Sequence, residues 1–78
     1  MDVRIGVANS MREIELDVDD AIDRTELKAH IEEALSDDEN VLWMADRKGR
    51  EVAVPASKVS YVEIGSPVEN RKIGFSAG

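Results

Sequence analysis

The chain lacks cysteine altogether, and its 78 residues include only one histidine and one each of tryptophan, tyrosine and phenylalanine. Without cysteine there is no disulfide framework, and the common structural zinc sites lose their thiolate ligands. No apolar run approaches the roughly 20 residues of a membrane-spanning helix, and the start of the chain does not resemble a signal peptide. We therefore expect one small cytoplasmic domain with no membrane contact.

The 10 basic residues are outnumbered by 17 acidic ones, which gives a formal net charge of −7. The charge is unevenly distributed, because residues 1–40 carry 13 acidic and 4 basic side chains (net −9) and residues 41–78 carry 4 acidic and 6 basic ones (net +2). An acidic protein is repelled by nucleic acid and by anionic membranes at long range. The composition therefore favours a protein partner over a polyanion.

Alternating apolar residues predict two strands near the start of the chain, at Val3–Val7 and Ile14–Val18. The polar pair Asn9-Ser10 between them predicts a turn, and hence an antiparallel hairpin. Asp23 precedes Glu26 by three residues, which is the capping-box spacing, and a helix should run from about Arg24 to Ser36.

The second half of the chain is predicted to form strands. A hairpin is expected from Val41–Ala45 and Glu51–Val54, with Gly49 at a positive φ in its turn. Pro55 should end the second arm, since proline has no N–H for a sheet. Val59–Ile64 and Arg71–Phe75 then predict two more strands, the last pairing with the one before it. We expect a single domain over residues 1–75 and a frayed tail at 76–78.

This order of elements predicts an α+β fold in which one helix packs on one face of a mixed sheet. A hairpin followed by a helix and a return into the sheet resembles the β-grasp, or ubiquitin-like, plan. The alternative is an antiparallel meander with the helix laid across it. Fold alone assigns no function in either case.

Four blocks of sequence, taken in order, resemble those of a family of small actinobacterial proteins of unknown function: Val3–Val7, Asp46–Ala56, Tyr61–Gly65 and Arg71–Phe75. The resemblance covers nearly the whole chain and implies a cytoplasmic, stand-alone protein. Some members are labelled ATP-binding in genome annotation, but the family has no established activity to transfer to these residues.

Nucleotide binding of the usual kind needs a glycine-rich loop with a lysine and a hydroxyl residue at fixed spacing. The five glycines here are scattered, so we expect no ATP or other cofactor. A basic set could contact phosphate if the hairpin turn and the last strand were neighbours, and it comprises Arg47, Lys48, Arg50, Lys58, Arg71 and Lys72. Charged turns and edge strands that prevent sheet aggregation are the favoured interpretation of the same residues.

The acidic residues Asp17, Asp19, Asp20 and Asp23 could hold calcium or magnesium, but their spacing does not match an EF-hand loop. Helix capping explains them better, and we expect no metal site. Catalysis requires a nucleophile with a base, paired carboxylates or a metal, and the lone histidine, His30, lies on the flank of the apolar stripe of the predicted helix, where a partly buried structural residue is the favoured interpretation. We therefore expect no catalytic residues and no enzyme.

Trp43 and Met44 are adjacent in a strand and must point to opposite faces of the sheet. The favoured interpretation places Trp43 in the core, and the alternative makes Trp43 or Tyr61 the anchor of a partner interface. Our leading hypothesis is a non-catalytic protein-interaction module, either monomeric or weakly dimeric. The alternative function is weak binding of nucleic acid or of a nucleotide phosphate by the basic hairpin and last strand.

Overall fold

The computed structural model describes residues 1–66, which form five strands, one α-helix and a single 3₁₀ turn. In chain order these are β1 (Asp2–Val7), β2 (Glu13–Asp17), α1 (Arg24–Leu35), β3 (Val41–Ala45), β4 (Glu51–Pro55), η1 (Ala56–Lys58) and β5 (Val59–Ile64). Each of the five strands and the α-helix matches its prediction within about two residues. The predicted strand Arg71–Phe75 and the tail at 76–78 lie outside the described residues.

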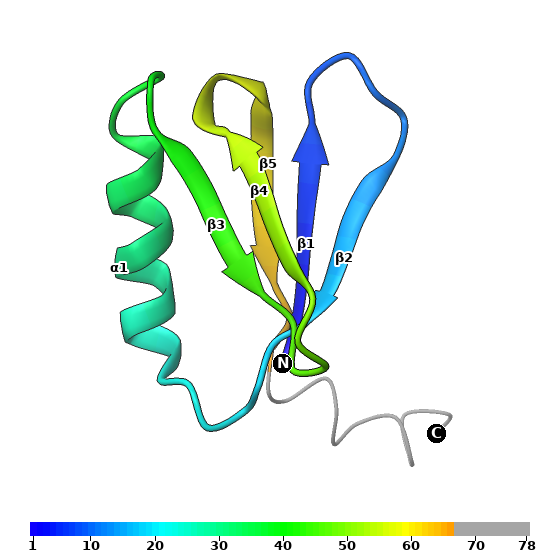
Figure 1. The fold of residues 1–78 in the computed structure, drawn as a ribbon, viewed down its shortest axis with the longest axis vertical. Coiled ribbons are helices and arrows are strands. Elements are labelled where there is room, and N and C mark those ends of the chain that lie inside the picture. Colours follow the sequence, from blue (N-terminus) through cyan, green and yellow to red (C-terminus); the bar gives the residue numbers. More distant parts are fainter. Residues whose placement is uncertain (67–78) are drawn as a thin grey trace.

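The strands form two separate antiparallel sheets (Figure 1). One has the order β2-β1-β5, and the other is the β3–β4 hairpin. The predicted mixed sheet is not observed, because all three strand pairings in residues 1–66 are antiparallel. The α+β class with one helix is confirmed, and the β-grasp plan gains no support from these pairings. The register of the β1–β5 pair shifts between Gly6, which pairs with Tyr61, and Val7, which pairs with Val59.

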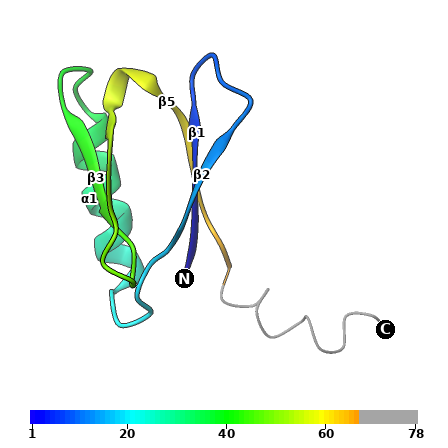
Figure 2. The ribbon, with the colours of Figure 1, turned by 45° about the vertical axis from the view of Figure 1, so that its right-hand side comes forward.

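The two sheets face one another, with α1 lying beside the β3–β4 hairpin in the same layer (Figure 2). Alternate residues of each strand point into the space between the layers, as the period of a strand requires. Burial of this apolar surface is the main source of stability for the domain. The fully or nearly fully buried core consists of Val3, Ile5, Leu16, Val18, Leu27, Ile31, Ala34, Leu42, Met44 and Val54.

The helix begins where the sequence predicts it to begin. Asp23 is the N-cap, and its Oδ2 accepts a hydrogen bond from the Glu26 N–H at 3.0 Å. This satisfies one of the amides that every helix leaves unpaired in its first turn. The helix buries Leu27, Ile31 and Ala34, whereas Leu35 is 37% exposed.

The turn between β3 and β4 joins the two sheets. Gly49 has a φ of 95°, which confirms the predicted positive φ. Asp46 accepts the Asp17 N–H at 3.0 Å and the Lys48 N–H at 2.8 Å, and the Arg47 N–H donates to the Asp17 carbonyl at 2.8 Å. Arg50 donates to the Glu15 carbonyl at 2.6 Å. These bonds cap the outer edge of β2 and hold the hairpin in place.

Candidate interaction surface

The two outer faces of the molecule differ in chemistry. The outer face of the β3–β4 hairpin is apolar, and we call it the Trp43 face; its exposed residues are Val41, Trp43, Ala45, Ala53 and Pro55. Trp43 lies at its centre, opposite Ala53 across the hairpin, and is 56% exposed. Glu51, which pairs with Ala45 at the turn end, is its charged border.

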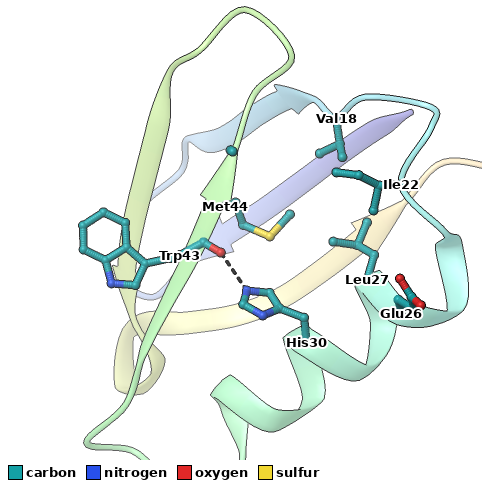
Figure 3. A pocket seen from close by; sticks show the side chains of 8 residues that line it. Val18, Ile22, Glu26, Leu27, His30, Trp43 and Met44 are labelled. Carbon is teal, nitrogen blue, oxygen red and sulfur yellow. Dashed lines mark hydrogen bonds between the residues drawn. The ribbon is translucent and has the colours of Figure 1, made fainter.

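An apolar groove runs between α1 and the edge of β3 that pairs with no strand within residues 1–66, next to the Trp43 face (Figure 3). Its volume is about 230 Å³, and Ile22, Leu27 and Met44 are among the residues that line it. His30 crosses this groove from the helix, with its Nε2 at 2.8 Å from the Trp43 carbonyl oxygen. Since a neutral or charged imidazole can donate here, His30 satisfies an edge-strand carbonyl that would otherwise face solvent.

The position of Trp43 corrects the favoured prediction that it belongs to the core. Met44 is the core residue, with 4% of its surface exposed, and the indole of Trp43 points away from the groove and from the core (Figure 3). The expectation that adjacent residues take opposite faces is confirmed. The alternative prediction, that Trp43 is available to a partner, is consistent with this exposure.

Tyr61 lies elsewhere, on the outer face of the β2-β1-β5 sheet, so the two aromatic residues do not form one site. Its ring covers Gly6, its partner across the β1–β5 pairing. Its hydroxyl donates to a Glu13 carboxylate oxygen, and this hydrogen bond raises the pKa of the phenol. Arg4 on the same face pairs with Glu63 at 3.7 Å and Asp2 at 3.5 Å. This face is polar and internally paired, which indicates a solvated surface.

The described members of the basic set are not gathered into one face. Arg47 pairs with Asp17 at 3.7 Å and Arg50 pairs with Asp46 at 3.9 Å, at the turn end of the β3–β4 hairpin. Lys58 follows the other end of β4, in η1 (Figure 1). Arg71 and Lys72 lie outside the described residues, so phosphate contact by the last strand stays a prediction.

The acidic cluster has structural partners. The Met1 ammonium lies 2.6 Å from Asp20 and 3.3 Å from Asp17, and the hydrogen bond to Asp20 raises the pKa of the ammonium and lowers that of the carboxyl. Asp19 accepts the Ala21 N–H at 2.9 Å, and Asp23 caps the helix. Over residues 1–66, no three histidine or carboxylate side chains are placed to hold a metal ion.

The groove contains residues that the sequence did not single out. Ile22 is the clearest, because it is 42% exposed and lies between the acidic residues that precede the helix. An isolated isoleucine in an acidic stretch is a signal that could have been noticed. Leu27 and Met44 carried no such signal, since their spacing is that of ordinary core residues.

The described part of the chain contains no helix that is long and apolar enough to cross a membrane. A family model with the description "Protein of unknown function (DUF3107)" matches residues 1–76. No curated protein matches the chain in sequence.

Proposed function

The chain belongs to the DUF3107 family of proteins of unknown function, and from this premise we propose that it is a non-catalytic module that binds a short, basic, amphipathic helix of another protein. The binding surface would be the Trp43 face together with the α1–β3 groove. The module would act in the cytoplasm, without a cofactor.

The exposure of Trp43 carries this proposal. A tryptophan that is 56% exposed at the centre of an apolar sheet face costs solubility, whereas the opposite face of the molecule is charged and internally paired. Tryptophan is over-represented among the residues that contribute most to protein interfaces. An apolar patch bordered by polar residues is the usual mark of such a surface.

The size of the surface favours a short segment over a second folded copy. Two strands of five residues form a face of about 17 Å by about 10 Å, given the rise along a strand and the spacing between strands. A standard protein interface buries about 800 Å² on each partner, which is several times this footprint. A helix laid along the α1–β3 groove would instead contact both Trp43 and the groove lining, including Ile22 and Leu27.

Charge favours a basic segment. Glu26 lines the groove directly, and the acidic residues Asp19, Asp20 and Asp23 lead into the helix that forms one wall. The first forty residues, which supply this wall, have a net charge of −9. Lysine or arginine residues on the flank of a bound helix would be attracted to it, and the attraction would weaken as salt increases.

The test is a selection from a library of displayed helical peptides against the wild-type protein, with Trp43→Ser as the counter-target. Met11→Ser is the matched control, because Met11 is a fully exposed apolar residue on the connection between β1 and β2, remote from the surface. We expect peptides with apolar residues at i, i+3, i+4 and i+7 and with basic flanks, which bind wild type and Met11→Ser but lose at least about tenfold in affinity for Trp43→Ser. Peptides that bind all three proteins equally, or no enrichment at all, would refute the proposal.

A further inference from the structure

A second groove lies between α1 and β5, and the helix lines it with other residues than those that line the α1–β3 groove. Its volume is about 310 Å³. The apolar part of its lining is Ile31, Val62 and Ile64, and its rim carries Arg24, Lys28 and Glu32. Val62 and Ile64 pack only partly against the core, so part of their apolar surface faces the groove.

The backbone of β5 is directed toward this groove at two residues. Within residues 1–66, β5 is the last strand of its sheet and pairs only with β1. The Gly65 N–H donates to the Asp2 carbonyl of β1 at 2.7 Å, and the backbone groups of successive residues alternate between the two edges of a strand. Those of Val62 and Ile64 therefore point away from β1, in agreement with the bond of 3.2 Å from Arg24 to the Ile64 carbonyl. We call this side of the strand the β5 edge.

The fold protects the two edges of this sheet differently. At β2 the turn of the β3–β4 hairpin occupies the edge, through hydrogen bonds made by Asp46, Arg47 and Arg50. At the β5 edge, within residues 1–66, the Arg24 side chain binds the carbonyls at the end of the strand and leaves the backbone of Val62 directed at the groove. A strand edge beside apolar surface is the arrangement to which an added strand binds.

The rim of the groove is basic at one end and acidic at the other. Arg24 lies beside the end of β5, since it donates to the Ile64 and Gly65 carbonyls. Lys28 is about 6 Å and Glu32 about 12 Å further along the helix axis. Because α1 and β5 run in opposite directions (Figure 1), the two cations lie toward the end of β5 and the carboxylate lies toward its start.

The two cations are an exception in an acidic part of the chain. Residues 1–40 contain 13 acidic side chains and only four basic ones, and two of the four, Arg24 and Lys28, are on this rim. None of the ion pairs found within residues 1–66 involves Lys28. A cationic border on an apolar groove attracts a ligand of the opposite charge, so the favoured occupant is acidic.

We infer that the β5 edge and this groove bind an extended segment of another protein, in which acidic residues are followed by alternating apolar ones. The segment adds to the sheet as a strand antiparallel to β5, which continues the pairing of the sheet and is the slightly more stable arrangement. The edge supplies main-chain hydrogen bonds, and the groove takes every second side chain. In this direction the segment enters at the end of β5, so its first residues lie beside Arg24 and Lys28.

This inference is independent of the function proposed for the Trp43 face, because the two surfaces share no lining residue. It also predicts the opposite charge for the partner. The Trp43 face and the α1–β3 groove are proposed to bind a basic helix, whereas the β5 edge binds an acidic strand.

The test uses the full-length protein and a capped synthetic peptide with two glutamates followed by an alternating run of valine and threonine. Binding is followed by heteronuclear NMR titration at low salt. We expect shifts centred on Lys28, Val62 and Ile64, and at least about tenfold more protection of the Val62 amide from hydrogen exchange at saturating peptide. The amides of Tyr61 and Glu63 are the internal control, because they face β1 and should keep their protection.

Two matched comparisons test the main-chain bonds and the charge. Directly opposed residues of antiparallel strands share a face, so methylation of the valine amides removes the donors that face β5, and methylation of the threonine amides removes donors that face away from it. We expect only the first to abolish binding. Lys28→Glu should weaken binding at least about threefold, whereas Lys48→Glu, the same change in the β3–β4 turn outside the groove, should not.

Each other outcome overturns the inference. Val62 and Ile64 amides that are already protected in the protein without peptide would show that the β5 edge is not available to a partner. Shifts confined to the Trp43 face would place the peptide on the other surface. Equal binding of the two methylated peptides would exclude pairing with the edge, and equal binding by Lys28→Glu and Lys48→Glu would exclude the role of the rim charge. No binding at about 1 mM peptide, which detects even weak complexes, would refute the inference outright.

Discussion

The ring of Tyr61 packs on Gly6, and this contact decides whether the substitution Gly6→Ala stabilises or destabilises the protein. A Cβ added at Gly6 would lie 2.6 Å from Cδ2 of the Tyr61 ring and still closer to Cε2, which is well inside van der Waals distance. The positive φ that favours glycine is found at Gly49 and not at Gly6. The backbone of Gly6 therefore tolerates alanine, and only the tyrosine ring opposes the substitution.

We expect Gly6→Ala to destabilise the otherwise wild-type protein by about 1–3 kcal/mol, the usual range for adding a methyl group where there is no room. In a Tyr61→Ala background the ring is absent. The same substitution should then stabilise by about 0.4–1 kcal/mol, because alanine has less conformational entropy to lose on folding than glycine. The effect of a single methyl group is thus predicted to change sign with a residue 55 positions away in the sequence.

The assay is urea unfolding of the four proteins of this double-mutant cycle, followed by far-ultraviolet circular dichroism. Gly49→Ala is the control, since its Cβ would meet nothing within 4 Å and its cost comes from a φ of 95° alone. Its effect should be the same with and without Tyr61. A cost for Gly6→Ala that does not depend on Tyr61 would refute the reasoning, because it would place the strain in the backbone of β1.

Three further predictions concern stability. Leu42→Ala should cost about 2–5 kcal/mol in thermal or urea unfolding, because Leu42 is fully buried, whereas Trp43→Ala should cost under about 1 kcal/mol; equal costs would contradict the assignment of their faces. Asp23→Ala should lower the free energy of unfolding by about 1 kcal/mol, because the helix loses its cap. Asp23→Asn is the control and should keep most of the wild-type stability, since asparagine also caps helices. Equal stabilities of the two variants would contradict the role of the cap. The hydrogen bond from the Asp17 N–H lowers the pKa of Asp46, so the stability that Asp46 adds is present above its unfolded pKa of about 3.9 and is lost as the pH falls through the lower folded value. The difference between wild type and Asp46→Asn in urea unfolding should therefore be largest near neutral pH and shrink below about pH 4, and a difference that grows on acidification would contradict this sign.

Much of the local structure could be predicted because helix caps, turns and strand ends depend on interactions among a few neighbouring residues. The capping pair of Asp23 and Glu26, the positive φ at Gly49 and the end of β4 at Pro55 all follow from the chemistry of neighbouring residues. The candidate site was predicted only in part. Trp43 was named as an interface anchor, but the core was the favoured place for it, and the groove beside it was not anticipated.

Trp43 was assigned to the wrong face because both faces of its strand are apolar. Every residue of Val41–Ala45 is apolar, so its alternation does not say which set faces inward. The neighbouring strand β4 determines the orientation of β3. Glu51 must face solvent, so its partner Ala45 lies on the outer face, and Trp43 lies on the same face as Ala45. That inference needs the register of the hairpin, which the sequence leaves uncertain by a residue.

Within residues 1–66, the sequence by itself determined which segments are strands or helix and, to within about two residues, where they begin and end. Only the tertiary structure decided that β5 pairs antiparallel to β1, that Tyr61 covers Gly6 while Trp43 faces outward, and that grooves lie on both sides of α1. The division has a physical cause. Propensities and caps depend on residues within one turn or one strand, whereas sheet order, side-chain facing and grooves depend on which distant surfaces exclude water together.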